Sequence, residues 1–162
     1  MNLSAYPKLF RFGLNVWPPF LGAGISVTRI STDWREVEVA SRLRWRNRNY
    51  VGTHFGGNLF MMTDPFYMLM LMHNLGSAYR VWDRSSCIDF LAPGRGTVTA
   101  SFALDEALLE DIRTRTAGGE KHLRELTADI RDEAGATIAA VRKVLYIRKK
   151  KPSEFAPAAR EV

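Results

Sequence analysis

One stretch of the sequence decides how the rest is interpreted: Thr53-His54-Phe55-Gly56-Gly57-Asn58-Leu59-Phe60-Met61-Met62-Thr63-Asp64-Pro65. It leads into an apolar run, and Asp64 is the only residue with a formal charge between Val51 and Tyr79. An ionised carboxylate that leaves water without compensation is costly, so it must be paired, hydrogen-bonded, partly wetted or used in chemistry. We therefore expect Asp64 to line a cleft in a largely buried position, and we look for function there.

The glycine pair in this stretch favours an anion-binding helix start. Backbone N–H groups at a helix N-terminus have no intrahelical acceptor, and glycine lets a ligand approach the main chain closely. Gly57 and Asp64 are seven residues apart. That spacing is two helical turns, so they should share one face at about 10 Å along the axis. The arrangement suits a carbonyl near Gly57 and a water or attacking group near Asp64.

A second interpretation of Asp64 is structural. Asp followed by Pro is a good helix start, with the carboxylate capping the first turn and Pro65 at the first helical position. A residue before proline also avoids helical geometry. The pattern alone therefore leaves both a cap at a helix kink and a catalytic carboxylate open.

The flanking sequence predicts an α+β fold. A short helix is expected over residues 3–16, ended by Pro18-Pro19. Alternating apolar residues predict a hairpin of two strands over residues 25–45, and a buried helix follows from Gly56. Further strands are expected at 79–90, 97–104, 123–132 and 137–148, with a short helix at 105–116. An antiparallel sheet wrapped around one buried helix satisfies this order.

Size and composition fit one domain. The 162 residues are near the commonest domain size, with residues 1–21 as an N-terminal helical segment and 149–162 as a flexible tail. The single cysteine leaves no internal disulfide, which suits a reducing, cytoplasmic location. The apolar run 59–75 contains Asp64 and falls short of the roughly 20 apolar residues that a spanning helix needs. We expect no membrane insertion.

The net charge of +6 raises the question of an anionic partner. Much of the excess lies in two groups, Arg42-Arg44-Arg46-Arg48 and Arg148-Lys149-Lys150-Lys151, both most simply solvated. No nucleic-acid recognition motif accompanies the charge, so we expect no nucleic-acid partner. The three histidines are scattered, which argues against a metal site. Walker and dinucleotide motifs are absent, and no cofactor is expected.

The run from Gly56 to Asp64 resembles the signature of hotdog-fold acyl-CoA thioesterases, especially the phenylacetate-degradation type. There a His-Gly-Gly opens the central helix, and an acidic residue follows seven positions after the second glycine. Further matches to a less characterised, thioesterase-like branch are Asp64-Pro65-Phe66, Leu75-Gly76, Ile88-Asp89-Phe90 and Pro93-Gly94-Arg95-Gly96. The resemblance implies a hotdog fold, an antiparallel sheet wrapped around one long central helix, in a homodimer or homotetramer.

The same resemblance implies an acyl-CoA or acyl-carrier-protein substrate and a site between protomers. Asp64 would act as general base or nucleophile, and the Gly57 N–H would polarise the thioester carbonyl. Asn49 and His54 would help to orient substrate or water. The other substrate-binding candidates are Gly56, Asn58, Phe55, Arg84 and Arg95. The two arginines are candidates for contact with coenzyme A phosphates, although a solvated arginine is the simpler interpretation of each.

This sequence departs from the family pattern at one place. Phe55 occupies the position of the family's histidine, and His54 precedes it. Either the loop shifts so that His54 substitutes, or the role is absent. Two other functions therefore stay open: a non-catalytic acyl or lipid binder, and a dehydratase or hydratase that would pair Asp64 with His54 or His73.

Overall fold

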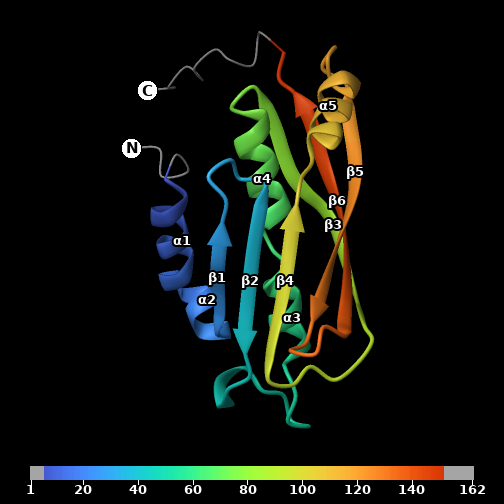
Figure 1. The fold of residues 1–162 in the computed structure, drawn as a ribbon. Helices are drawn as coiled ribbons and strands as arrows, with labels where there is room; N and C mark the ends of the chain where they lie inside the picture. Colours follow the sequence, from blue (N-terminus) through green and yellow to red (C-terminus); the bar gives the residue numbers. More distant parts are fainter. Residues whose placement is uncertain (1–5, 152–162) are drawn as a thin grey trace, which may run out of the picture.

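Six strands form one antiparallel sheet in the computed structural model, which describes residues 6–151 (Figure 1). The strands are β1 (Ile25–Ile30), β2 (Glu36–Arg42), β3 (Tyr79–Phe90), β4 (Thr97–Ala103), β5 (Lys121–Arg131) and β6 (Thr137–Lys149). Their order across the sheet is β1-β2-β4-β5-β6-β3. β1 and β3 are therefore the two edges.

The central helical layer consists of α3 (Gly56–Met61) and α4 (Phe66–Leu75), which lie behind the sheet in Figure 1. Their buried side chains form one core with the inward residues of the strands, among them Leu59, Met62, Phe66, Met70, Leu71, Val98, Phe102, Ile130, Val141 and Leu145. This is the expected hotdog arrangement. Burial of this apolar surface is the main favourable contribution to folding.

The central helix is divided at residues 62–65, and the Asp64–Pro65 peptide bond is cis. Proline has no N–H to continue the helical hydrogen bonds and restricts the residue before it. The expected continuous face from Gly57 to Asp64 is therefore wrong, because the two residues lie on either side of the end of α3. The kink itself was one of the two interpretations of Asp64-Pro65.

The N-terminal segment forms two helices, α1 (Pro7–Val16) and α2 (Pro18–Ala23). α1 ends at Val16, just before Pro18-Pro19, as expected, but these prolines also begin α2, which the sequence did not predict; a missing N–H costs nothing at a helix start. Asn15 exchanges hydrogen bonds with the backbone of Val27 in β1, at 2.7 and 3.1 Å. α1 thus covers the β1 edge, and β3 remains the open edge of the sheet.

The predicted hairpin is shorter than expected at its second strand. β2 ends at Arg42, and Trp45 begins a 3-10 turn, η2 (Trp45–Asn47), with 86% of its surface exposed. The buried Asn47 side chain anchors this turn by donating to the carbonyls of Ala23 and Arg42, at 3.2 and 2.9 Å. The chain therefore leaves the sheet and turns back toward α3.

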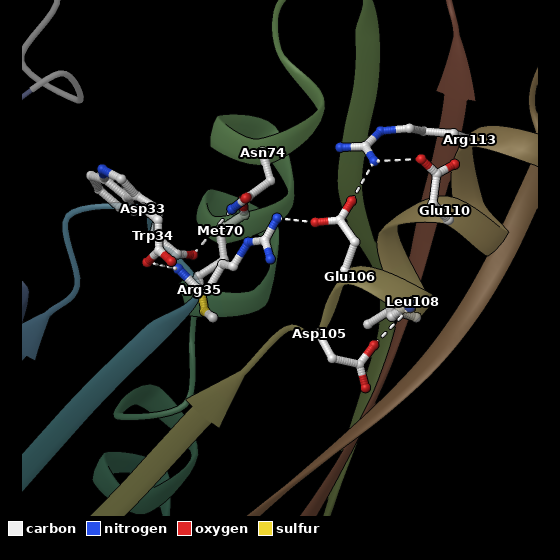
Figure 2. A network of polar contacts seen from close by, with 10 residues as sticks. All are labelled: Asp33, Trp34, Arg35, Met70, Asn74, Asp105, Glu106, Leu108, Glu110 and Arg113. Atoms are coloured by element: carbon white, nitrogen blue, oxygen red, sulfur yellow. Dashed lines mark hydrogen bonds and ion pairs between the residues drawn. The ribbon is translucent and has the colours of Figure 1, made fainter.

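α5 (Glu106–Arg115) lies at the end of the sheet where α4 finishes (Figure 1). Figure 2 shows the polar network there: Arg35 binds Glu106, Glu106 binds Arg113, and Arg113 also binds Glu110. The Asn74 amide of α4 donates to the carbonyls of Trp34 and Met70. These contacts tie the β1–β2 turn to α4 and α5.

The predicted N-terminal segment and tail fall partly outside the described residues. Residues 1–5 and 152–162 are not described, while Lys149, the first residue of the predicted tail, still belongs to β6. Within residues 6–151, no helix is both long enough and apolar enough to cross a membrane.

Candidate functional site

A pocket of about 540 Å³ lies between the loop that precedes α3 and the segment after β3. Four predicted site residues line it, namely Asn49, His54, Gly56 and Arg95. Apolar residues complete the wall: Val51, Leu59, Phe90, Leu91, Ala92 and Pro93. The structure therefore brings the loop candidates together in a partly apolar hollow beside the start of α3.

Asn49 shapes the loop on one side of this pocket. Its backbone N–H donates to the Thr53 carbonyl at 2.8 Å, and its side-chain oxygen accepts from the Thr53 N–H at 3.0 Å. Its side-chain amide donates to the Thr53 hydroxyl at 2.9 Å and to the His54 carbonyl at 3.2 Å. Asn49 thus closes the turn that carries His54 into the pocket wall.

His54 is buried and joins two loops. Its backbone N–H donates to the Gly94 carbonyl at 3.0 Å, and its Nε2 lies 3.2 Å from the Gly96 carbonyl. Burial lowers the pKa of His54, while the hydrogen bond to Gly96 acts in the opposite direction. A neutral ring with Nε2–H as donor satisfies this contact. His54 Nδ1 is buried without a hydrogen-bond partner among the described residues.

Two aromatic rings cover the glycine pair at the start of α3. A Cβ on Gly56 would meet Phe90 Cζ at 2.8 Å, and a Cβ on Gly57 would meet Phe55 Cε1 at 2.6 Å. A side chain at either position would therefore require the ring that covers it to shift. Phe55, the residue in the family's histidine position, is 54% exposed and lies over Gly57 rather than over the pocket.

Asp64 is not buried as expected. Its side chain is 60% exposed, because the junction between α3 and α4 carries it to the surface of the chain. It does not belong to the pocket lining, which lies at the other end of α3. The prediction of a largely buried Asp64 is wrong for this chain.

A lysine that the sequence interpretation did not consider binds Asp64. Lys143 Nζ lies 2.9 Å from Asp64 Oδ1 and 2.8 Å from Asp83 Oδ2. A longer contact of 3.5 Å reaches the Thr63 carbonyl. The Lys143 side chain is only 1% exposed and that of Asp83 19%. We call these three residues, Asp64, Asp83 and Lys143, the lysine cluster.

Asp83 has a perturbed titration in this cluster. Burial raises the pKa of Asp83, whereas the hydrogen bond and charge of Lys143 lower it and the nearby Asp64 raises it. Asp83 Oδ1 is buried and has no hydrogen-bond partner among the described residues. The cluster therefore combines a buried cation, one half-buried carboxylate and one carboxylate open to water.

The contacts of Asp64 separate its two sequence interpretations. α4 begins at Phe66 after Pro65, with no side-chain hydrogen bond at the cap, so Asp64 does not cap the second helix. Neither candidate histidine is its partner: His54 contacts Gly96, and His73 stacks on Trp34 with ring centroids 5.1 Å apart. The His–acid pair of a dehydratase is not formed within the described chain.

The remaining candidates belong to neither the pocket lining nor the lysine cluster. Arg84 is exposed on β3, where the pairing with β6 shifts register between Asp83 and Ser85. Asn58 is half-buried and reaches the Ala23 carbonyl at 3.5 Å. No group of three or more His, Cys, Asp or Glu side chains suited to a metal ion occurs within residues 6–151.

Comparison with known proteins places this architecture among hotdog folds. A protein of Pseudomonas aeruginosa described as a probable thioesterase has a TM-score of 0.79 at 17% identity, over 88% of this chain and 95% of that one. A Haemophilus influenzae thioesterase has a TM-score of 0.64 at 16% identity, over 88% and 90%. A Chlorobaculum tepidum protein described as of unknown function has a TM-score of 0.71 at 18% identity, over 92% of this chain and 100% of that one.

A family model then gives the particular assignment. The chain belongs to the DUF4442 family, a domain of unknown function, whose model matches residues 7–147. No curated protein matches the chain. At the identities above, the solved structures establish the shared fold, and the chemistry has to be argued from the site.

Proposed function

We propose that this protein hydrolyses an acyl thioester, with an acyl-CoA as substrate. The observation that carries the proposal is Asp64, which occupies the acidic position of the motif and presents a carboxylate open to water while a buried ammonium group holds it. The thioesterase descriptions of two structural neighbours support the same reaction.

The proposed reaction uses Asp64 as general base. Asp64 takes a proton from a water whose oxygen adds to the thioester carbonyl carbon, and the Gly57 N–H stabilises the oxyanion that forms. The carbon–sulfur bond then breaks, and the proton passes to the departing thiolate. The products are a carboxylic acid and a free thiol, so atoms and charge balance.

The pocket and Asp64 lie at opposite ends of α3, and we propose that a second copy of the chain unites them. A helix of this length spans about 9 Å, so the Asn49–His54 loop and Asp64 of one chain do not face each other directly. The open β3 edge, with exposed Trp82 and Phe90, is the surface available for pairing. A homodimer, or a dimer of dimers, follows. Light scattering that gives a monomer at micromolar concentration would contradict it.

The substrate's carrier is expected to meet the basic side chains. Arg95 lines the pocket, and Arg84 is exposed one residue beyond Asp83. Both suit phosphate groups of coenzyme A, because guanidinium groups bind phosphate through paired hydrogen bonds. An acyl-carrier protein remains the alternative carrier, since its pantetheine carries the same thioester with a single phosphate.

The decisive experiment is thiol release from short, medium, long and aromatic acyl-CoAs by wild type and Asp64→Asn. Loss of a general base lowers turnover by about two to four orders of magnitude, with a smaller effect on binding. Asp129→Asn is the matched control, because it removes an exposed carboxylate of β5 that pairs with Arg131. Equal turnover of wild type and Asp64→Asn would overturn the assignment of Asp64.

One observation favours a second candidate, a non-catalytic acyl or lipid binder. The Phe55 ring lies against Gly57, where the oxyanion would bind, and the family's histidine is absent from that position. Wild type that binds acyl-CoAs but releases no thiol from any of them would establish this alternative. Phe55→His then tests whether the missing side chain is the reason.

A further inference from the structure

Lys143 is the most deeply buried charged side chain that the reaction above leaves without a role. It lies on β6 between β5 and β3, where its neighbours in register are Leu126 and Ser86. Removing an ammonium group from water is costly unless charged and polar partners surround it. Its three contacts, to Asp64, Asp83 and Thr63, provide that compensation.

These contacts join a rigid part of the molecule to a less regular one. β6 pairs on both sides and belongs to the core, whereas Asp64 stands in the non-helical junction between α3 and α4. Lys143 holds this junction at two points, the Thr63 carbonyl and the Asp64 carboxylate. Asp83, which is in register with Leu145 of β6, also binds the ammonium group, at 2.8 Å.

We propose that Lys143 is the positioning residue for Asp64, and that Asp83 keeps Lys143 in place. The ammonium group fixes one oxygen of the Asp64 carboxylate, while the exposed side remains available to the attacking water. Lys143 transfers no proton and does not touch the substrate. The catalytic meaning of this role rests on the proposed thioesterase reaction, in which Asp64 acts as base.

Three variants separate this role from a purely structural one. Lys143→Met removes the charge and keeps most of the side-chain length, and Lys143→Arg keeps the charge. The double variant Lys143→Met/Asp83→Asn removes the cation and its more buried carboxylate together, so folding is preserved without an unpaired buried charge. Lys149→Met, an exposed residue on the same strand, is the control.

Activity is measured as kcat and KM with the best acyl-CoA. We expect both variants with Met at position 143 to lose about 10- to 100-fold in kcat at neutral pH, with KM changed by less than about threefold. Lys143→Arg, which keeps the charge beside Asp64, should keep most of the wild-type kcat.

A second measurement does not depend on activity. In protein labelled with ¹³C at the aspartate carboxyls, Asp64 is assigned by its loss in Asp64→Asn. Its carboxyl resonance should shift in the double variant relative to wild type, because no ammonium group then holds one of its oxygens. Unchanged kcat and an unchanged Asp64 carboxyl resonance in a folded double variant would overturn the proposal.

The failure of the proposed function is distinguishable from the failure of this inference. If wild type releases no thiol, hydrolysis is refuted, and the positioning role for catalysis falls with it even when the Asp64 carboxyl resonance responds to Lys143. If wild type is active and Asp64→Asn is impaired while both variants with Met at position 143 match wild type, only the role of Lys143 is refuted.

Discussion

Two groups of ion pairs in this fold show how burial changes what a charge can do. In the lysine cluster, Lys143 is 1% exposed and binds two carboxylates, those of Asp64 and Asp83. In the network of Figure 2, Arg113 likewise binds two carboxylates, Glu106 and Glu110, but the three side chains are 35%, 52% and 63% exposed. The number of carboxylate partners per cation is the same, and the access of water differs.

The difference in water access determines which of the two groups of ion pairs can be removed without a large loss of stability. Water and salt screen the exposed pairs, so each contributes little to stability. The buried ammonium group has no water to replace a lost partner, and an uncompensated buried charge is strongly unfavourable. We infer that the network at α5 tolerates substitution, whereas the lysine cluster constrains both stability and the position of Asp64.

The largest expected effect comes from removing both carboxylates around Lys143. Asp64→Asn/Asp83→Asn leaves the cation buried without a counter-charge, which should cost about 3–5 kcal/mol in the free energy of unfolding. Adding Lys143→Met should recover most of that loss, because well-packed apolar replacements of buried ion pairs are often neutral. Urea denaturation of the double and triple variants measures both.

The matched test removes two carboxylates from an exposed cation. Glu106→Gln/Glu110→Gln strips Arg113 of its two partners in Figure 2 and should shift the urea midpoint far less. If the two double variants lost similar amounts of unfolding free energy, burial would not determine how much an ion pair contributes to stability, and the comparison would fail.

His54 should come next in size, as a buried polar group outside both clusters. His54→Ala removes the hydrogen bond to the Gly96 carbonyl, which keeps the Leu43 N–H as a donor, at a cost of about 0.5–1.5 kcal/mol in unfolding free energy. His73→Ala, which removes a ring stacked on Trp34, controls for loss of an imidazole elsewhere.

The kinetics of His54→Ala answer the question that Phe55 raised. Because His54 is buried and engaged with Gly96, we expect turnover to fall less than in Asp64→Asn. A loss as large as that of Asp64→Asn, in a variant that remains folded, would mean that His54 has taken the role of the family's histidine.

Most of the fold was predictable because its signals are local. Alternating apolar residues predicted the strands at 25–30, 79–90 and 97–103 within a few residues, and the glycine pair correctly marked the start of α3. The errors lie where local preference is ambiguous. Pro18-Pro19 both ends one helix and begins another, and Trp45 continues the alternation of β2 although the chain has already left the sheet.

The site was only half predictable. The motif identified the residues near Gly56, and the structure gathers four of the predicted residues in one pocket. The partners of Asp64 were missed, because Asp83 and Lys143 are 19 and 79 residues away and meet only through sheet pairing. One signal was present: Lys143 interrupts the buried positions 141, 145 and 147 of β6, and a lysine on the inward face of a strand needs a counter-charge.

A smaller effect is the acid dependence of the lysine cluster. The pKa of Asp83 is raised from the ordinary value of 3.8, so above that pH the unfolded chain loses this proton before the folded protein does. The contribution of Asp83 to stability therefore falls as pH rises from 3.8 through its folded-state pKa. Over this pH range, the unfolding free energy of Asp83→Asn, measured by urea denaturation, should increase relative to that of wild type. If the difference between the two proteins did not change with pH, the raised pKa of Asp83 would be contradicted.

The smallest effect should have the opposite sign, and it belongs to the exposed network. Hydrogen bonds from Arg113 and Arg35 lower the pKa of Glu106 below 4.5. Its contribution to stability is therefore complete above pH 4.5 and is lost as pH falls through the folded-state pKa. As pH rises, the unfolding free energy of wild type should therefore increase slightly relative to that of Glu106→Gln, whereas it should decrease relative to that of Asp83→Asn.

High salt should reduce the difference in unfolding free energy between wild type and Glu106→Gln more than the difference between wild type and Asp83→Asn, because screening reaches exposed charges more readily than buried ones. Parallel urea series in low and high salt measure both differences. If the two differences in unfolding free energy changed with pH in the same direction, the lysine cluster and the network at α5 would not differ in the way their burial implies.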